Sequence, residues 1–288
     1  MYVSAKVAST HAIADSGLGK TGGCAKDATL KGQTCSFDST SSKSVTAVFV
    51  PTAAASADPV TIVVWIHGDI IPCGDEGRDA ISYVKSNEFP LARQITDSKK
   101  PFVLAVPTMN WTFGRNKFVH ALGTPKTMNA FVEEVRSGLT HAGWSKAPAL
   151  GRLILAGHSR AYVVLNALAA AVKVPESSTG ALAKLTDVWL LDATYGKRNV
   201  KVHCSKWIEW AKAHAKAPNF INLRVLYRKA SGTSDVAECI LAEAARAALP
   251  NVVGRGVPSH CSLPREELPA LLAASVPVVQ SSRGTRGL

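Results

Sequence analysis

Short aliphatic runs alternate with helix-like stretches along most of the chain, and this alternation limits the fold more than any other feature. The runs are continuous and rich in Val, Ile and Leu, as expected of parallel strands buried on both faces of a sheet. They are residues 45–50, 60–66, 102–106, 153–156, 188–191 and 223–227. The helix-like stretches are residues 79–95, 126–141, 161–172, 206–215, 236–248 and 265–274. The pattern predicts an α/β fold, in which a mostly parallel central sheet is flanked by helices on both faces.

Composition divides the 288 residues into three parts. Residues 1–43 are rich in Gly, Ser, Thr and Lys, and we expect an irregular N-terminal segment there. Residues 44–275 contain no linker or internal repeat, which predicts one domain, and residues 276–288 are expected to be a disordered tail. With 47% hydrophobic residues the chain can bury a large core. No run approaches the roughly 18 apolar residues of a membrane span, so we expect no transmembrane segment.

Basic residues exceed acidic ones by 33 to 21, and most of the excess lies between residues 196 and 230. That stretch contains nine Lys and Arg and a single acid, Glu209. Such a surface attracts anionic polymers in general. Because no aromatic-rich nucleic-acid motif accompanies the charge, we interpret it as a solvated helix face with strand ends and expect no nucleic-acid partner.

The chain has six cysteines and no Cys-x-x-Cys pair, which argues against a zinc ribbon or a thioredoxin-like redox site. Cys24 and Cys35 flank a segment poor in core residues, and a disulfide between them would order it. This favours a secreted or periplasmic protein. The first ten residues lack the basic-then-apolar pattern of a signal peptide, so if the protein is secreted we expect its leader to have been removed.

The run at 153–156 ends in Gly157-His-Ser159-Arg-Ala161 and continues directly into helix-like sequence. A nucleophilic serine at a tight strand-to-helix turn requires small residues two positions before and after it. Gly157 and Ala161 meet that requirement. The helix N-terminus beyond the turn would also stabilise developing negative charge. The motif predicts Ser159 as a nucleophile.

Two further motifs lie at chain positions that suit the same chemistry. The run at 60–66 ends at His67-Gly68-Asp69, and His260 lies in a loop with Gly, Pro and Ser just before the last helix-like stretch. An imidazole that reaches a nucleophilic serine can remove its proton, so His260 is a candidate general base. We expect the His67 side chain to brace its loop.

Residues 44–275 thus resemble the α/β-hydrolase superfamily, and in particular bacterial serine esterase and lipase-like members. These pair a Gly-His-Ser elbow with a strand end that reads Leu-Asp-Ala-x-Tyr-Gly, as residues 191–196 do here. The resemblance implies carboxylic ester hydrolysis through an acyl-enzyme on Ser159, with His260 as the base. The backbone N–H groups of Asp69 and Arg160 would form the oxyanion hole. It implies a small-molecule or polymeric ester substrate and no metal or organic cofactor; the same residues would also serve amide hydrolysis or acyl transfer.

Two aspartates are candidates for the acid that orients His260. Asp192 ends the strand after the elbow helix, whereas Asp235 follows the 223–227 run, which is the commoner location in the family. Either residue could instead cap a helix or turn. We favour Asp192, because the motif around it is the more distinctive. Trp111 lies just past the end of the 102–106 run and is predicted to line the pocket.

Two other sequence patterns suggest different functions. Residues 14–21 resemble a phosphate-binding loop ending in Lys20 and Thr21, but they lack its first glycine and a flanking buried strand. The loop leaves nucleotide binding as an alternative function. A second alternative is a non-catalytic binding protein with the hydrolase fold. The dipeptides His203-Cys204 and His260-Cys261 lack chelating spacings, so we predict structural thiols or disulfide halves and no metal site.

Overall fold

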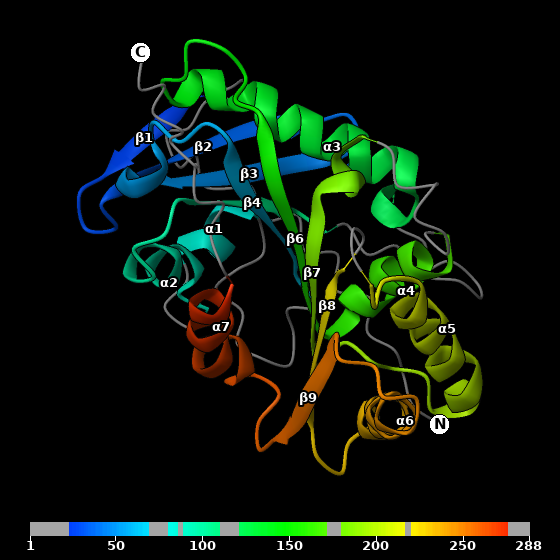
Figure 1. Cartoon of the computed structure of the whole chain (residues 1–288). Coiled ribbons are helices and arrows are strands. Elements are labelled where there is room, and N and C mark those ends of the chain that lie inside the picture. Colours follow the sequence, from blue (N-terminus) through cyan, green and yellow to red (C-terminus); the bar gives the residue numbers. More distant parts are fainter. Residues whose placement is uncertain are drawn as a thin grey trace, which may run out of the picture.

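A computed structural model describes residues 23–68, 80–85, 89–109, 121–171, 180–216 and 220–275. Its strands form a nine-stranded sheet in the order β1-β2-β3-β5-β4-β6-β7-β8-β9 (Figure 1). The strands are β1 (Cys24–Asp27), β2 (Gly32–Ser39), β3 (Ser44–Pro51), β4 (Val60–Ile66), β5 (Phe102–Pro107), β6 (Leu150–His158), β7 (Leu185–Leu191), β8 (Asn222–Arg228) and β9 (Val252–Val257). The helices are α1 (Ala80–Lys85), α2 (Leu91–Asp97), α3 (Pro125–Gly138), α4 (Tyr162–Ala171), α5 (Val200–Ala213), α6 (Ser234–Arg246) and α7 (Leu263–Ala274).

Strands β5, β4, β6, β7, β8 and β9 run parallel, and β1 to β3 extend the sheet in antiparallel fashion. The predicted fold class is therefore confirmed. The register pairs Ile66 with Gly157 and Leu191 with both His158 and Leu226. The carboxyl ends of β4, β6, β7 and β8 thus meet at one edge of the sheet, which is where open α/β sheets bind ligands.

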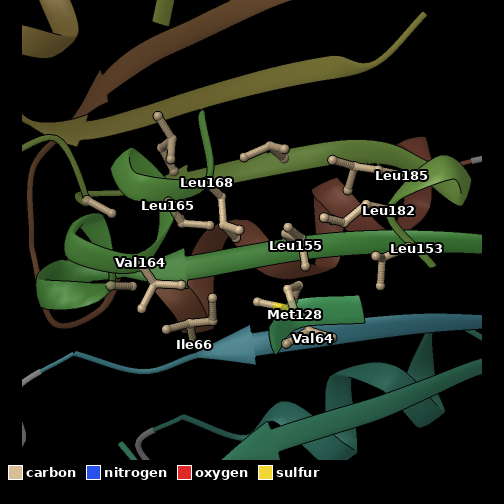
Figure 2. Packing of buried hydrophobic residues seen from close by; sticks show 14 of the residues in the cluster. Val64, Ile66, Met128, Leu153, Leu155, Val164, Leu165, Leu168, Leu182 and Leu185 are labelled. Atoms are coloured by element: carbon tan, nitrogen blue, oxygen red, sulfur yellow. The ribbon is translucent and has the colours of Figure 1, made fainter. Parts of the chain in front are cut away.

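The two faces of the sheet are covered by different sets of helices (Figure 1). On one face α3 to α6 enclose a mainly aliphatic core, part of which Figure 2 shows around Leu155, Leu165 and Leu168. Each such side chain contributes about 1.5–3 kcal/mol when fully buried. On the other face α1, α2 and α7 pack over a cluster that includes Trp65, Trp189 and several smaller rings. Among the described residues, no helix is long and apolar enough to cross a membrane.

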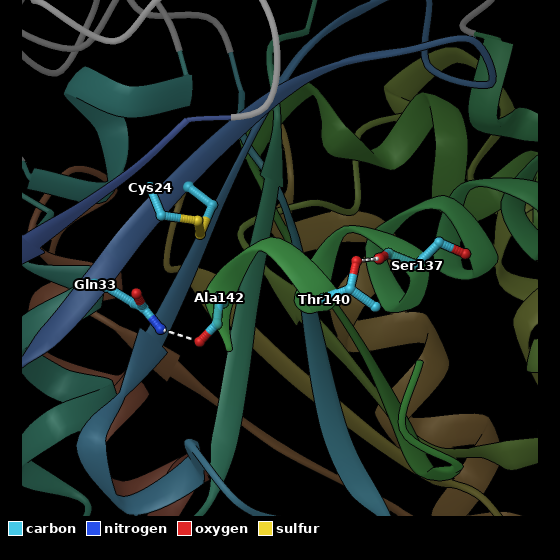
Figure 3. Close-up of a disulfide and its surroundings, with 6 residues drawn as sticks. Cys24, Gln33, Ser137, Thr140 and Ala142 are labelled. Carbon is cyan, nitrogen blue, oxygen red and sulfur yellow. Dashed lines mark hydrogen bonds between the residues drawn. A yellow bond between two sulfur atoms is a disulfide. The ribbon is translucent and has the colours of Figure 1, made fainter. Parts of the chain in front are cut away.

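The N-terminal prediction is wrong for residues 24–39, which form β1 and β2 rather than an irregular segment. Polar residues alternate with apolar ones in this hairpin at the sheet edge, so it carries no continuous aliphatic run. The predicted disulfide between Cys24 and Cys35 is confirmed and joins directly paired positions of the hairpin (Figure 3). The Gln33 amide also donates to the Ala142 carbonyl (Figure 3). Residues 276–288, the predicted disordered tail, lie outside the described residues.

Three other elements differ from the sequence-based expectation. The predicted helix at 79–95 is two short helices, α1 and α2, with Pro90 at the start of the second. Helix α5 begins at Val200, six residues before the predicted start. Strand β9 was not predicted, because glycines interrupt it. A Cβ atom at Gly254 would lie 2.0 Å from the Val225 carbonyl oxygen, so this close approach between β9 and β8 requires glycine.

Helix α7 is held from both ends, and this matters because it directly follows the loop that carries His260. The Gln94 amide on α2 donates to the Pro264 and Arg265 carbonyls at the start of α7. At the other end the Lys100 ammonium donates to three carbonyl groups, those of Leu272, Ala273 and Ser275. The Lys100 bonds satisfy carbonyl groups that the C-terminal end of a helix leaves unpaired.

Candidate active site

Ser159 occupies the turn between β6 and α4 in a strained backbone conformation. Its φ angle is +56°, in the left-handed region that residues with a side chain rarely adopt, and its side chain is buried at 5% exposure. Such a conformation costs about 1–3 kcal/mol and persists only when the surroundings enforce it. A Cβ atom at Gly157 would lie 2.7 Å from the Ala161 Cβ, so the small residues around Ser159 permit the turn. The local geometry is that of a strand-to-helix elbow.

The end of β4 packs directly against this elbow. A Cβ atom at Gly68 would lie 2.4 Å from the Ser159 Cβ, which explains the glycine at this position. The Met109 N–H donates to Nε2 of His67 at 2.9 Å, so the ring proton is on Nδ1 and is donated to the Gly68 carbonyl, also at 2.9 Å. His67 therefore braces this loop, as expected. Asp69, the next residue, lies outside the described residues.

His260 and Asp192 are joined by a hydrogen bond between the imidazole Nδ1 and the carboxylate Oδ2. Asp192 follows β7 with a φ angle of +49° and is 2% exposed. Its other oxygen, Oδ1, accepts from the Arg228 N–H at 2.9 Å and from the Thr233 hydroxyl. Burial alone would raise the pKa of Asp192, but the hydrogen bonds from His260, Thr233 and Arg228 outweigh it and lower that pKa. Asp192 is thus held as a carboxylate.

Asp235 occupies a different environment from Asp192. It is exposed in the first turn of α6, where a negative charge interacts favourably with the helix dipole. Nδ1 of His260 already has Asp192 as its partner. Of the two candidate acids, the structure brings Asp192 to His260.

Three residues that the sequence motifs did not predict as functional lie in the same site. Thr233 donates to Asp192, as described above. The Tyr195 phenol is half-buried, and burial raises its pKa. A hydrogen bond with the Ser159 side chain partly offsets this rise in pKa. His158, the residue before Ser159, has its Nε2 3.0 Å from the carbonyl oxygen of His260. A clue to Tyr195 was its place in the Asp192 motif, whereas the contacts of Thr233 and His158 join segments far apart in the sequence.

The predicted site residues thus fall into two groups. Ser159, Arg160, Asp192 and His260 gather at the carboxyl edge of the parallel strands, with Arg160 half-buried in the turn after Ser159. Asp69 and Trp111 lie outside the described residues, as do Lys20 and Thr21 of the phosphate-loop alternative.

Both cysteines of the His-Cys dipeptides are halves of disulfides. Cys204 pairs with Cys239 and so joins α5 to α6, and Cys261 is disulfide-bonded as well. Neither thiol is therefore free to bind a metal ion. Within the described ranges, no group of three or more His, Cys, Asp or Glu side chains could hold one.

No protein-family model and no curated protein matches this sequence. Solved structures do match its fold. An S-formylglutathione hydrolase from Agrobacterium tumefaciens is 12% identical, with a TM-score of 0.53 over 87% of this chain and 97% of that one. A structure described as FAE is also 12% identical, with a TM-score of 0.50 over 88% and 93% of the two chains. Together with the strand order, these likenesses show that the chain has the α/β-hydrolase fold.

Proposed function

We propose that the protein is a serine hydrolase that cleaves carboxylic esters through an acyl-enzyme on Ser159. The observation that carries the proposal is the hydrogen bond between His260 and a buried, ionised Asp192, at the sheet edge where Ser159 sits in a strained elbow. A serine hydroxyl is a weak nucleophile unless a base removes its proton, and an imidazole oriented by a carboxylate is the commonest such base.

The proposed reaction uses these residues as follows. Nδ1 of His260 is bonded to Asp192, which leaves Nε2 to take the proton as the Ser159 hydroxyl attacks the ester carbonyl. The negative charge on the carbonyl oxygen would be stabilised by the backbone N–H groups of Asp69 and Arg160. His260 then protonates the departing alcohol as its bond to the acyl carbon breaks. Water, activated by His260, releases the acid and regenerates Ser159.

The same residues would also serve amide hydrolysis or acyl transfer, so the ester is the proposed substrate class and not a deduction from the fold. The names of the structural neighbours include a hydrolase of a thioester-type compound, S-formylglutathione. We expect either a small-molecule or a polymeric ester to be accepted.

The cysteines support a secreted or periplasmic location. All five cysteines in the described part of the chain are disulfide-bonded. Disulfides form and persist in oxidising compartments and are rare in the cytosol. When the non-reduced protein is treated with an alkylating reagent, mass spectrometry should therefore find no alkyl group on these cysteines.

The test is turnover of short-chain p-nitrophenyl esters by the wild-type protein and by Ser159→Ala. Removal of a triad nucleophile typically lowers kcat by about 10⁶-fold. Ser42→Ala is a matched control, because Ser42 is similarly buried at 3% exposure but bonds to Ser44 in the β2–β3 turn. We expect the control to retain wild-type kcat. Wild-type turnover by a folded Ser159→Ala variant would overturn the proposal.

A further inference from the structure

His158 lies at the junction of the candidate nucleophile and the candidate base. It is the last residue of β6 and is 2% exposed. Its neighbour Gly157 faces α4, and because side chains alternate along a strand, His158 points to the opposite face of the sheet. There its ring centroid lies 4.5 Å from that of His260 and 5.8 Å from that of Phe89.

The hydrogen bond from His158 reaches the main chain of His260. Nε2 of His158 is 3.0 Å from the His260 carbonyl oxygen, and a carbonyl oxygen can only accept, so Nε2 carries a proton. Burial, followed by the neighbouring His260, lowers the pKa of His158 to about 3. The ring is therefore neutral near pH 7 and donates from Nε2 alone.

A row of rings extends from the end of β4 to the candidate base. Consecutive ring centroids are 4.5 Å apart for His67 and Tyr83, 5.3 Å for Tyr83 and Phe89, 5.8 Å for Phe89 and His158, and 4.5 Å for His158 and His260. Aromatic pairs at these separations attract each other beyond simple burial. The row links the loop braced by His67 to the loop that carries His260.

We propose that His158 is a positioning residue for the His260 base: it holds the His260 main chain through its Nε2–H and supports the imidazole ring. This inference rests on the proposed function. His260 is then fixed at two points, by Asp192 on Nδ1 and by His158 on the carbonyl oxygen.

The neutrality of His158 matters for catalysis. The base must become an imidazolium in the transition state, and a charged neighbour 4.5 Å away would oppose that step. A neutral histidine supplies a ring and a hydrogen-bond donor without that repulsion. Misplacing a catalytic group by about 1 Å can cost about 100-fold in rate, so this positioning is expected to affect kcat rather than substrate binding.

Two substitutions separate the donor from the ring. His158→Gln keeps an N–H donor at a similar reach and loses the ring, whereas His158→Phe keeps a ring and loses the donor. The control is His214→Phe. Like His158, His214 is buried, at 1% exposure; its Nδ1–H donates to the Trp210 carbonyl at 2.7 Å, and its ring lies 4.5 Å from the Trp210 ring. Unlike His158, it lies away from the candidate site, and its own carbonyl accepts from the Ile221 N–H just before β8.

For each variant we would measure kcat, KM, Tm and the downfield NMR resonance of the His260 Nδ1 proton, assigned by its loss in Asp192→Asn. We expect His158→Phe to lose about 100-fold in kcat with KM within about twofold, and to broaden this resonance. His158→Gln should retain kcat within about tenfold and keep the resonance. His214→Phe should lower Tm and leave both kcat and the resonance unchanged.

The inference is overturned if His158→Phe keeps wild-type kcat and an unchanged resonance, or if His158→Gln is as impaired as His158→Phe. These outcomes are distinct from a failure of the proposed function. That failure shows as wild-type turnover in Ser159→Ala, whereas here Ser159→Ala would be inactive and His158→Phe active.

Discussion

The chain places a candidate acid at the ends of two neighbouring strands, and the two places differ in almost every physical respect. Asp192, after β7, is 2% exposed, has a φ angle of +49° and binds His260, Thr233 and the Arg228 backbone through its two oxygens. Asp235, after β8, is exposed in the first turn of α6. One carboxylate is enclosed by donors and the other faces solvent.

The loop after β8 nevertheless takes part in the site through Thr233. Its hydroxyl donates to Asp192, and its carbonyl accepts from the Thr194 hydroxyl at 2.9 Å. The β8–α6 loop therefore supplies a hydrogen-bond donor to Asp192, the acid we propose. From this difference we infer that Asp192 is the orienting carboxylate, because other donors fix its oxygens and only a fixed carboxylate can fix an imidazole.

The largest expected effect comes from Asp192→Asn. The amide retains the shape of the side chain but stabilises the wrong tautomer of His260, so kcat should fall by about 10³- to 10⁴-fold. The measurement is ester turnover under saturating substrate, with circular dichroism to verify folding. Equal activity of Asp192→Asn and the wild type would remove Asp192 from the mechanism.

A smaller loss is expected from Thr233→Val, which removes one donor to Asp192 and keeps the side-chain shape. A hydrogen bond to a charged group contributes about 1.5–3 kcal/mol, so kcat should fall by about 10- to 100-fold. Thr186→Val is a suitable control, because Thr186 accepts from Arg152 at the start of β7, far along the strand from Asp192. A Thr233→Val variant as active as Thr186→Val would show that the β8–α6 loop does not support the acid.

Acid should destabilise the buried strand end. The folded-state pKa of Asp192 lies below its usual value, so the carboxylate contributes stability above about pH 4 that is lost as pH falls through the folded pKa. His158 acts in the same direction. It stays neutral down to about pH 3, whereas the unfolded chain is protonated below about pH 6.5. Urea unfolding from pH 7 to pH 3 should show this loss, with a shallower decline in Asp192→Asn and His158→Gln. Identical slopes in all three proteins would contradict it.

The smallest effect is expected from Asp235→Asn. Loss of an exposed negative charge in a helix first turn costs about 0.3–1 kcal/mol of stability. Because Asp235 is not the partner of His260, kcat should stay within about twofold of wild type. A variant that is folded but inactive would reverse the ranking of the two strand ends and leave the serine nucleophile in place.

The sequence predicted the parts of the fold whose signal is local. Six of the strands contain continuous aliphatic runs, and each run lies within an observed strand. The hairpin of β1 and β2 is half polar at the sheet edge, and β9 contains Gly254 and Gly256, so neither carries that signal. These strands are specified by pairing with their neighbours, which a single stretch of sequence does not reveal.

For the site, as for the fold, the sequence predicted the parts that have a local motif. Ser159 and His260 are predicted from an elbow motif and from chain order. The motif around Asp192 favours it over Asp235, and in the structure Asp192 is the one bonded to His260. The contacts of Thr233 and His158 are tertiary: they join residues 41 and 102 positions apart. Such contacts depend on how strand ends meet, and local sequence patterns do not encode them.

The central claim is that Ser159 is a nucleophile activated by its surroundings, and covalent labelling tests it most directly. The wild-type protein, incubated with a fluorophosphonate and digested, should carry one phosphonyl group on the peptide that contains Ser159. Labelling should be absent in Ser159→Ala, much slower in Asp192→Asn and unchanged in Asp235→Asn. An unlabelled wild-type protein, or a label on another serine that persists in Ser159→Ala, would contradict the account.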